Sequence, residues 1–441
     1  MTVLNPAIKN YKQHKLPILS PCYTAGTMPK LRIRPFHAVH PCGSDAPNVA
    51  SVPYDVINKE EAAEIAKGNE DSFIRVVRSE VDLPDDTSPY DEVVYKQART
   101  NYERLKEIGA LIKDNDAGIY LYRQIMGDHI QVGLVACCHV DDYNDGIIKK
   151  HEKTRQVKED DRTNHILALD ANSGPVFLTY RGTSTIDKLV DEEINKRPMF
   201  HFVAEDGVTH TGWKIGNERA LLDAFDEIPV AYIADGHHRS ASAARASVVR
   251  KSENPDHDGS EEYNWFLTVL FPSSQLDILS YNRVVADLCG KTPKAFLIEL
   301  DSIGSVVPCE NPIPEHAGSF CVYLGRACGG WYCVTITADT IDEQDPIASL
   351  DVDLLQQRVL SPMLDVGDPR SDTRIEFVGG IRGTKELEDR VNSGSAAVAF
   401  SMYPTTIEQL LDVADADLIM PPKSTWFEPK LRSGLFVHDL S

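Results

Sequence analysis

Signatures of several common enzyme classes are missing from this sequence of 441 residues. It contains no GxxxxGK[ST] and no GxGxxG after a strand-like segment, so P-loop and Rossmann nucleotide sites lack their fingerprints. HExxH and GxSxG are also missing, which argues against zincins and hydrolases with a nucleophile elbow. No apolar run approaches the roughly 18–20 residues that a membrane span needs, so we expect no membrane partner.

Positive charge and paired cysteines are also in short supply. The chain has 45 Lys and Arg against 67 Asp and Glu, a formal charge of −22. Because nucleic-acid binding needs clustered cations, we expect a small-molecule substrate and no nucleic-acid partner; the oligomeric state stays open. The nine cysteines are odd in number and form no CxxC pair, which favours reduced thiols in a cytoplasmic protein over zinc or disulfides.

The hydrophobic pattern predicts an α+β (mixed α/β) fold. Two strand-like runs flank Gly127-Asp128, a strong hairpin signal, residues 73–81 (FIRVVRSEV) read as a strand, and residues 90–112 have helical periodicity. We expect residues 1–27 to be a poorly ordered extension and residues 28–250 to form one α/β region. A polar linker at 251–263 then leads to a C-terminal α/β region at 264–441, with a loop at 420–434 closing over a site.

The sharpest local signal is the segment ADGHHRSASA, residues 234–243, where an apolar strand runs through a glycine turn into an alanine-rich helix. Free N–H groups at a helix start, together with the positive end of its dipole, form an anion site. Gly236 permits close approach of a ligand, and His237, His238 and Arg239 add hydrogen-bond donors. Asp235 could hold a metal ion or act as a base. The alternative is an ordinary helix cap with a surface ion pair.

A second signal is the charged segment KHEKTR at residues 150–155, followed by Lys158 and the triplet DDR at 160–162. Charge runs usually mark a solvated helix face. This one mixes cations able to neutralise a polyphosphate with carboxylates suited to Mg²⁺ or to proton abstraction. Two loops are weaker candidates: SVPYDVI places Asp55 after a Pro-Tyr turn, and MPPKSTWFEPK places Lys423 in a proline-broken segment near the C-terminus.

Taken together, SVPYDVI, KHEKTR, the DDR triplet, ADGHHRSASA, YNRVV (281–285) and MPPKSTWFEPK resemble domain-of-unknown-function family 1015. The resemblance covers nearly the whole chain from about Met28. The DGHHR turn is also similar to the phosphate loop of the ParB/sulfiredoxin-like superfamily, which implies a nucleotide-binding core of that kind with additional α+β regions. His237 stands where sulfiredoxins carry their reactive cysteine, and this departure speaks against sulfinic-acid reduction.

This resemblance implies an ATP-dependent kinase that phosphorylates free L-serine to O-phosphoserine, with Mg²⁺. The nucleotide phosphates would be bound by Gly236, His237, His238 and Arg239, with Lys150, His151 and Arg155 completing the cradle. Glu152 would be the general base and Asp235 the Mg²⁺ ligand or an alternative base, while Asp55 and Lys423 are candidates for substrate binding. The alternative is a non-catalytic regulatory protein that binds a nucleotide or another anion in the same cradle.

Overall fold

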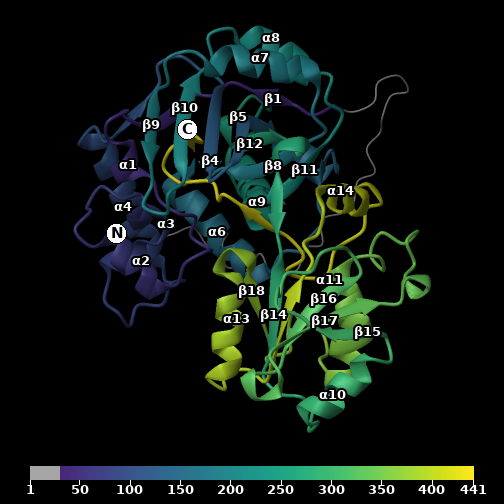
Figure 1. The fold of residues 1–441 in the computed structure, drawn as a ribbon. Helices are drawn as coiled ribbons and strands as arrows, with labels where there is room; N and C mark the ends of the chain where they lie inside the picture. Colours follow the sequence, from purple (N-terminus) through teal and green to yellow (C-terminus); the bar gives the residue numbers. More distant parts are fainter. Residues whose placement is uncertain (1–29) are drawn as a thin grey trace.

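The computed structural model of the protein describes residues 30–441, which form two lobes, each built around a β-sheet (Figure 1). Helices and strands are interspersed along both lobes, which confirms the predicted mixed α/β class. The expected extension at residues 1–27 lies outside the described residues. Within residues 30–441, no helix has both the length and the apolar character that crossing a membrane requires.

The first lobe is organised around a nine-stranded mixed sheet. Eight strands follow the order β6 (Ile148–Lys149), β11 (Ala231–Asp235), β8 (Val176–Tyr180), β12 (Trp265–Pro272), β5 (His129–His139), β4 (Tyr120–Met126), β10 (Thr209–Lys214) and β9 (Phe200–Val203), and β1 (Ile33–Arg34) pairs with β5. The expected hairpin joins β4 to β5 through Gly127, whose φ of 59° suits glycine. Parallel pairs join β6 to β11 and β8 to β12.

Both faces of this sheet are buried. Along β5, Leu134 and Ala136 belong to one core cluster, whereas Val135 and Cys137 belong to the opposite one, as the period of two in a strand requires. Five helices cover the first face: α5 (Val140–Asn144), α6 (Gln156–Leu169), α7 (Ser184–Ile194), α8 (Glu218–Phe225) and α9 (His237–Glu253). The second face is covered by α1 (Ala46–Val49), α14 (Ile407–Asp415) and the chain that follows α14.

A group of helices from the N-terminal part packs beside this core (Figure 1). It comprises α2 (Lys59–Ala66), α3 (Ile74–Val77), the 3-10 helix η2 (Ser79–Asp82) and α4 (Glu92–Glu107). Asn58 caps α2 in a capping box with Glu61. A small sheet of β3 (Leu111–Lys113), β2 (Ala38–Pro41), β21 (Val437–Asp439) and β7 (Ala171–Asn172) ties these helices to the C-terminus.

The strand predicted at residues 73–81 is wrong, because this segment forms α3 and η2. Ile74, Val76 and Val77 are all buried in one hydrophobic cluster with α2 and α4. A strand would point alternate side chains to opposite faces, so tertiary packing overrides the β propensity of these residues.

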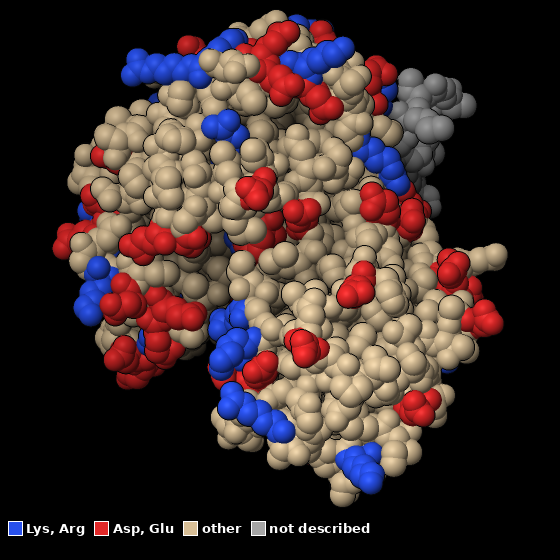
Figure 2. All heavy atoms as spheres, in the orientation of Figure 1, with Lys and Arg blue, Asp and Glu red and all other residues tan. Residues whose placement is uncertain are grey.

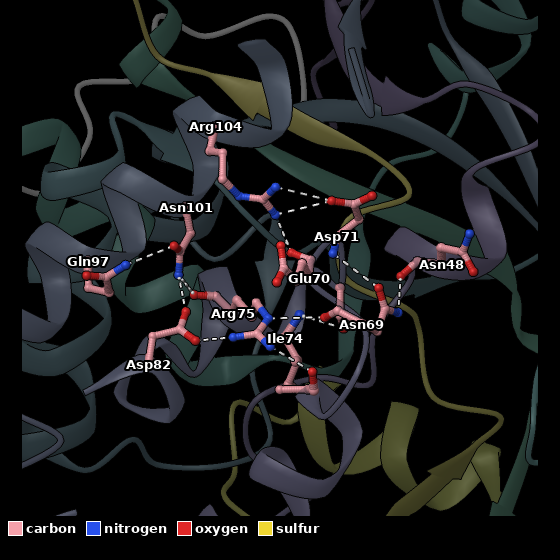
Figure 3. A network of polar contacts seen from close by, with 12 residues as sticks. Asn48, Asn69, Glu70, Asp71, Ile74, Arg75, Asp82, Gln97, Asn101 and Arg104 are labelled. Carbon is pink, nitrogen blue, oxygen red and sulfur yellow. Dashed lines mark hydrogen bonds and ion pairs between the residues drawn. The ribbon is translucent and has the colours of Figure 1, made fainter. Parts of the chain in front are cut away.

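A network of polar contacts fastens α3 and η2 to α4 (Figure 3). The guanidinium of Arg75 pairs with Asp82. The amide of Asn101 donates to the Arg75 carbonyl at 2.7 Å and to Asp82 at 2.8 Å. Arg104 reaches Asp71 at 3.2 Å. These bonds fix η2, which supplies one wall of the cavity described below.

The second lobe is an antiparallel six-stranded sheet with helices on both sides. Its strands follow the order β15 (Gly304–Pro308), β17 (Trp331–Ile336), β16 (Ser319–Tyr323), β19 (Val398–Met402), β14 (Tyr281–Val285) and β18 (Ile375–Gly379). The helices are α10 (Pro293–Leu300), α11 (Asp351–Leu355) and α12 (Ser361–Leu364) on one side and α13 (Gly383–Asn392) on the other, with a π-helical turn at Gln356–Leu360.

The two sheets divide the chain later than the expected linker at 251–263. Strand β12 follows that polar segment but lies in the middle of the first sheet, between β5 and β8. The second sheet begins only with β14, after a short ribbon of β13 (Asp277–Leu279) and β20 (Trp426–Glu428). The C-terminal residues return to the first lobe through β21, so the first lobe contains both the start and the end of the described chain.

Candidate functional site

The segments KHEKTR and DGHHR meet because two short strands are paired in parallel. Ile148 of β6 lies opposite Ala231 of β11, and Lys149 lies opposite Tyr232. The carboxyl ends of adjacent parallel strands lie at the same edge of a sheet, where open α/β sheets bind their ligands. KHEKTR follows β6 directly and DGHHR begins at the end of β11, so the chain delivers both to this edge.

Two long helices begin at this edge with their first turns uncapped by any side chain. Gly236 takes the left-handed conformation (φ 97°) that turns β11 into α9, and as the N-cap residue it has no side chain to cap the first turn of α9. Helix α6 also starts without a side-chain cap, after Arg155. The Arg155 N–H donates to Nε2 of His238 at 3.1 Å, which joins the two helix starts. Two positive dipole ends therefore converge on one place, an arrangement suited to an anion.

A cavity of about 400 Å³ opens at these helix starts. Its walls come from the loop around Tyr54, from η2, from the start of α4, from α6 and α9, and from the loop that carries Lys423. In Figure 2 the surface is hollowed between the N-terminal helices and the second lobe. Of the residues suggested by the sequence, those that line the cavity are Asp55, Glu152, Arg155, Asp235, Gly236, His237, His238, Arg239 and Lys423.

His151 and Lys150 lie behind the cavity rather than in its wall. The His151 ring is buried and meets the His237 ring edge to face, with the centroids 4.5 Å apart. Burial lowers the pKa of His151 to about 3 and that of His237 to about 4, so both imidazoles are neutral at pH 7. The Nζ of Lys150 lies 3.8 Å from the centroid of the Tyr143 ring. These two residues support the turn from behind.

His237 has a buried ring nitrogen beside the cavity without a hydrogen-bond partner in the described chain. Its side chain lines the cavity, the residue is only 7% exposed, and its Nε2 has no hydrogen-bond partner within residues 30–441. A buried polar nitrogen without a partner costs about 1–3 kcal/mol.

Asp235 is held ionised by two cations. Burial alone would raise its pKa, but Lys430 at 3.3 Å and Arg239 at 3.7 Å outweigh burial and hold that pKa well below its usual range. One carboxylate oxygen also accepts the Gly236 N–H at 2.8 Å. The Arg239 guanidinium is itself committed to the Pro175 carbonyl and to Asp235. Arg239 therefore has a structural role, which is to hold the turn between β11 and α9, in addition to lining the cavity.

The charged side chains that line the cavity are of two kinds, those that form an ion pair and those that do not. Three lining cations are paired with lining carboxylates: Arg78 with Glu80, Arg162 with Asp161 and Arg239 with Asp235. Five lining charges make no ion pair with any residue of the described chain: Asp55, Glu152, Arg155, Lys158 and Lys423. These five are the groups left free to act on a ligand.

The sequence pattern included Lys158 in the charged segment but gave it no role of its own, and it missed the aromatic wall. Lys158 lies three residues after Arg155 on α6, and this spacing places both on one helix face. Tyr54, Tyr90 and Tyr95 also line the cavity. Tyr95 lies on α4, whose regular periodicity favours a packing role, so no motif marked it. The hydroxyl of Tyr95 donates to Asp161 at 3.0 Å and ties α4 to α6.

Comparison with solved structures finds several chains that match this one at low identity and low TM-score. A mutant of a free serine kinase in complex with AMP matches with a TM-score of 0.32 and 13% identity, over 67% of this chain and 87% of that one. A conserved hypothetical protein from Pyrococcus furiosus has a TM-score of 0.32 and 14% identity, over 70% and 97%. SbnI from Staphylococcus aureus, truncated at its C-terminus, has a TM-score of 0.35 and 11% identity, over 67% and 82%.

No curated protein matches the sequence. A family model does match, over residues 33–353, and its description is "Protein of unknown function (DUF1015)". The matched range contains both KHEKTR and DGHHR, the two segments that meet at the cavity. The chain belongs to the DUF1015 family.

Proposed function

We propose that this protein is a small-molecule kinase that transfers a phosphoryl group from ATP to the hydroxyl of free L-serine. The observation that supports it most is the convergence of the α6 and α9 starts on one cavity that also contains unpaired cations and carboxylates. Phosphoryl transfer depends on positioning and charge neutralisation more than on covalent chemistry. This cavity offers donors for phosphates beside a carboxylate for the acceptor hydroxyl.

In this proposal the phosphates lie against the start of α9. The N–H groups after Gly236 lie at the cavity, with Arg155 and Lys158 on the neighbouring helix. A phosphate at a helix start gains from backbone donors and from the dipole together. The two unpaired cations neutralise further charge without first breaking an ion pair.

Glu152 is the proposed general base. It lines the cavity and has no cation bound to it within the described chain, so its carboxylate is free to accept the proton of a hydroxyl. Asp235 is a poorer base, because Lys430 and Arg239 hold its pKa low. Because Asp235 is ionised and lies near the proposed phosphate site, a role other than that of the base suits it better.

We assign to Asp235 the binding of Mg²⁺. Residues 30–441 contain no cluster of three or more metal-ligating side chains, and Mg²⁺ commonly binds through one or two carboxylates plus substrate phosphates. Asp235 fits that pattern, being ionised and placed where α9 begins. When bound with a nucleotide, the ion would neutralise charge on the phosphates.

Asp55 and Lys423 are proposed to bind the amino acid. Burial alone would lower the pKa of Lys423, but Tyr281, Glu152 and Asp55 raise it above its ordinary value. Lys423 therefore stays protonated and lies close to the proposed base. An ammonium group and a carboxylate in one subsite are complementary to the two charges of a free amino acid.

The proposal is tested by incubating purified protein with Mg-ATP and a panel of free amino acids and small alcohols, with products identified by mass spectrometry. We expect phosphorylated L-serine at a rate well above that of D-serine, threonine and ethanolamine. Saturable nucleotide binding without any phosphorylated acceptor would contradict the kinase and support a non-catalytic nucleotide or anion sensor.

A further inference from the structure

Lys423 reaches the cavity from a part of the chain outside the family match, which ends at residue 353. Its backbone has a φ of 60°, a left-handed conformation that non-glycine residues rarely adopt. Such a conformation persists only where the surroundings impose it. The contacts of the loop 420–426 show what those surroundings are.

The loop is fastened to the first lobe at His151. The N–H of Met420 donates to the His151 carbonyl at 2.9 Å, and the hydroxyl of Thr425 lies 3.4 Å from the His151 ring. The Thr405 hydroxyl, in the connection from β19 of the second lobe to α14, donates to the Ser424 carbonyl at 3.0 Å. Lys423 is therefore held between the two lobes at the point where they meet.

Arg283 makes a further contact to the loop, and its surroundings are unusual for a charged side chain. It lies on β14, is only 3% exposed and pairs with no carboxylate within residues 30–441. Its guanidinium donates to the carbonyl of Lys423 at 3.1 Å and to the carbonyl of Tyr281, and lies 5.5 Å from the centroid of the Phe377 ring. Burial lowers its pKa to about 10. A buried charge without a counter-ion is costly, and here it is bonded to the backbone of the residue that enters the cavity.

We infer that Arg283 is a positioning residue for the proposed reaction: it fixes the backbone of Lys423, so that the Lys423 ammonium meets the carboxylate of the acceptor. This inference rests on the proposed function and deepens it, because it makes the second lobe a part of the acceptor site. Tyr281, on the same strand, also contacts Lys423, because its ring centroid lies 5.3 Å from the Lys423 Nζ. The nucleotide phosphates lie at the other side of the cavity and do not depend on Arg283.

The kinetic test compares Arg283→Met, Arg283→Lys and Lys423→Met with the wild type. Loss of one charge-assisted hydrogen bond commonly weakens binding by about 10- to 100-fold, so we expect Lys423→Met to raise the KM for serine by that order. Arg283→Met should raise the same KM by at least about tenfold and leave the nucleotide Kd unchanged. Arg283→Lys should recover part of the loss, because one ammonium can still donate to a carbonyl.

The matched control is Arg390→Met. Arg390 lies in the same lobe on α13, where it bonds to Glu376 and Glu386, and it makes no contact with the loop. Its loss should lower the melting temperature without changing the KM for serine. The double variant of Arg283→Met with Lys423→Met should be no worse than Lys423→Met alone, since the two residues act as one unit.

A second readout does not depend on catalysis. Hydrogen–deuterium exchange of a peptide covering residues 418–427 should become at least about tenfold faster in Arg283→Met and stay unchanged in Arg390→Met. If Arg283→Met does not fold, Arg283→Lys and Thr405→Val carry the same test, and both should speed exchange in this peptide. Unchanged exchange and an unchanged KM in the folded variants would overturn the inference. If the wild type transfers no phosphate, the proposed function fails, whereas the exchange data still decide whether Arg283 holds the loop.

Discussion

Replacing Glu152 with glutamine is the perturbation that separates chemistry from binding most cleanly. The substitution keeps the size of the side chain and removes its negative charge, and with it the ability to take a proton. Within the described chain Glu152 makes no ion pair, so its loss breaks no internal contact of that kind. The free energy of unfolding should therefore change by no more than about 0.5 kcal/mol.

The effect on catalysis should be large and confined to the chemical step. Removing a positioned general base commonly costs about 10²- to 10⁴-fold in rate, which is about 3–5 kcal/mol of activation free energy. The nucleotide Kd should stay the same or fall slightly, because one negative charge leaves the cavity. The acceptor KM should change little, since the amino acid is proposed to bind through Asp55 and Lys423.

The assay measures phosphoserine formation at saturating Mg-ATP, with kcat and both KM values determined for each variant. Asp55→Asn is the matched control, since it removes the other unpaired carboxylate of the cavity. We expect it to raise the KM for serine and to change kcat by less than about threefold. A Glu152→Gln enzyme that keeps kcat within about threefold of the wild type would refute the assignment of the base.

Lys158→Met should weaken nucleotide binding about tenfold and reduce the salt dependence of that binding, as measured by titration calorimetry. Lys153 is an exposed lysine of the same segment outside the cavity wall, so Lys153→Met should leave the nucleotide Kd unchanged. Gly434 has a φ of 84°, and a Cβ there would lie 2.6 Å from Phe73, so Gly434→Ala should destabilise the fold by more than about 2 kcal/mol in urea unfolding. Burial and Arg432 lower the pKa of His210 to about 3, so the unfolded chain takes up the proton first as the pH falls below about 6.5. Stability should be full above pH 6.5 and fall towards pH 3, with about 2 kcal/mol lost from His210 at pH 5, and His210→Gln should flatten that part of the profile.

Local patterns of the sequence predict much of the first lobe. The two strand-like runs on either side of the turn at Gly127 are enough to place β4 and β5, because both depend on neighbours in the chain. The segment 73–81 fails for the opposite reason. Its β-branched residues suit a strand, and only packing against α2 and α4 makes it helical.

The candidate site depends on pairings that no local pattern contains. The motifs KHEKTR and DGHHR could be recognised as chemically rich, and the parallel pairing of β6 with β11 brings them together. That pairing joins residues about eighty positions apart and involves only two residue pairs. The same limit applies to Lys430, whose ion pair with Asp235 sets the ionisation of that carboxylate from the far end of the chain.

The domain boundary also depends on long-range pairing. The polar segment at 251–263 has the composition of a linker, yet α9 runs into it and β12 leaves it for the centre of the first sheet. Polarity shows that a segment is solvated, but it does not show whether the strand that follows joins the previous sheet or a new one.

A crystal structure of the protein with ADP and Mg²⁺ tests the central claim most directly. The phosphates should lie between the starts of α6 and α9, with phosphate oxygens within hydrogen-bond distance of the His237 backbone N–H and of Arg155. A nucleotide bound at saturating concentration with its phosphates away from both helix starts would contradict the account.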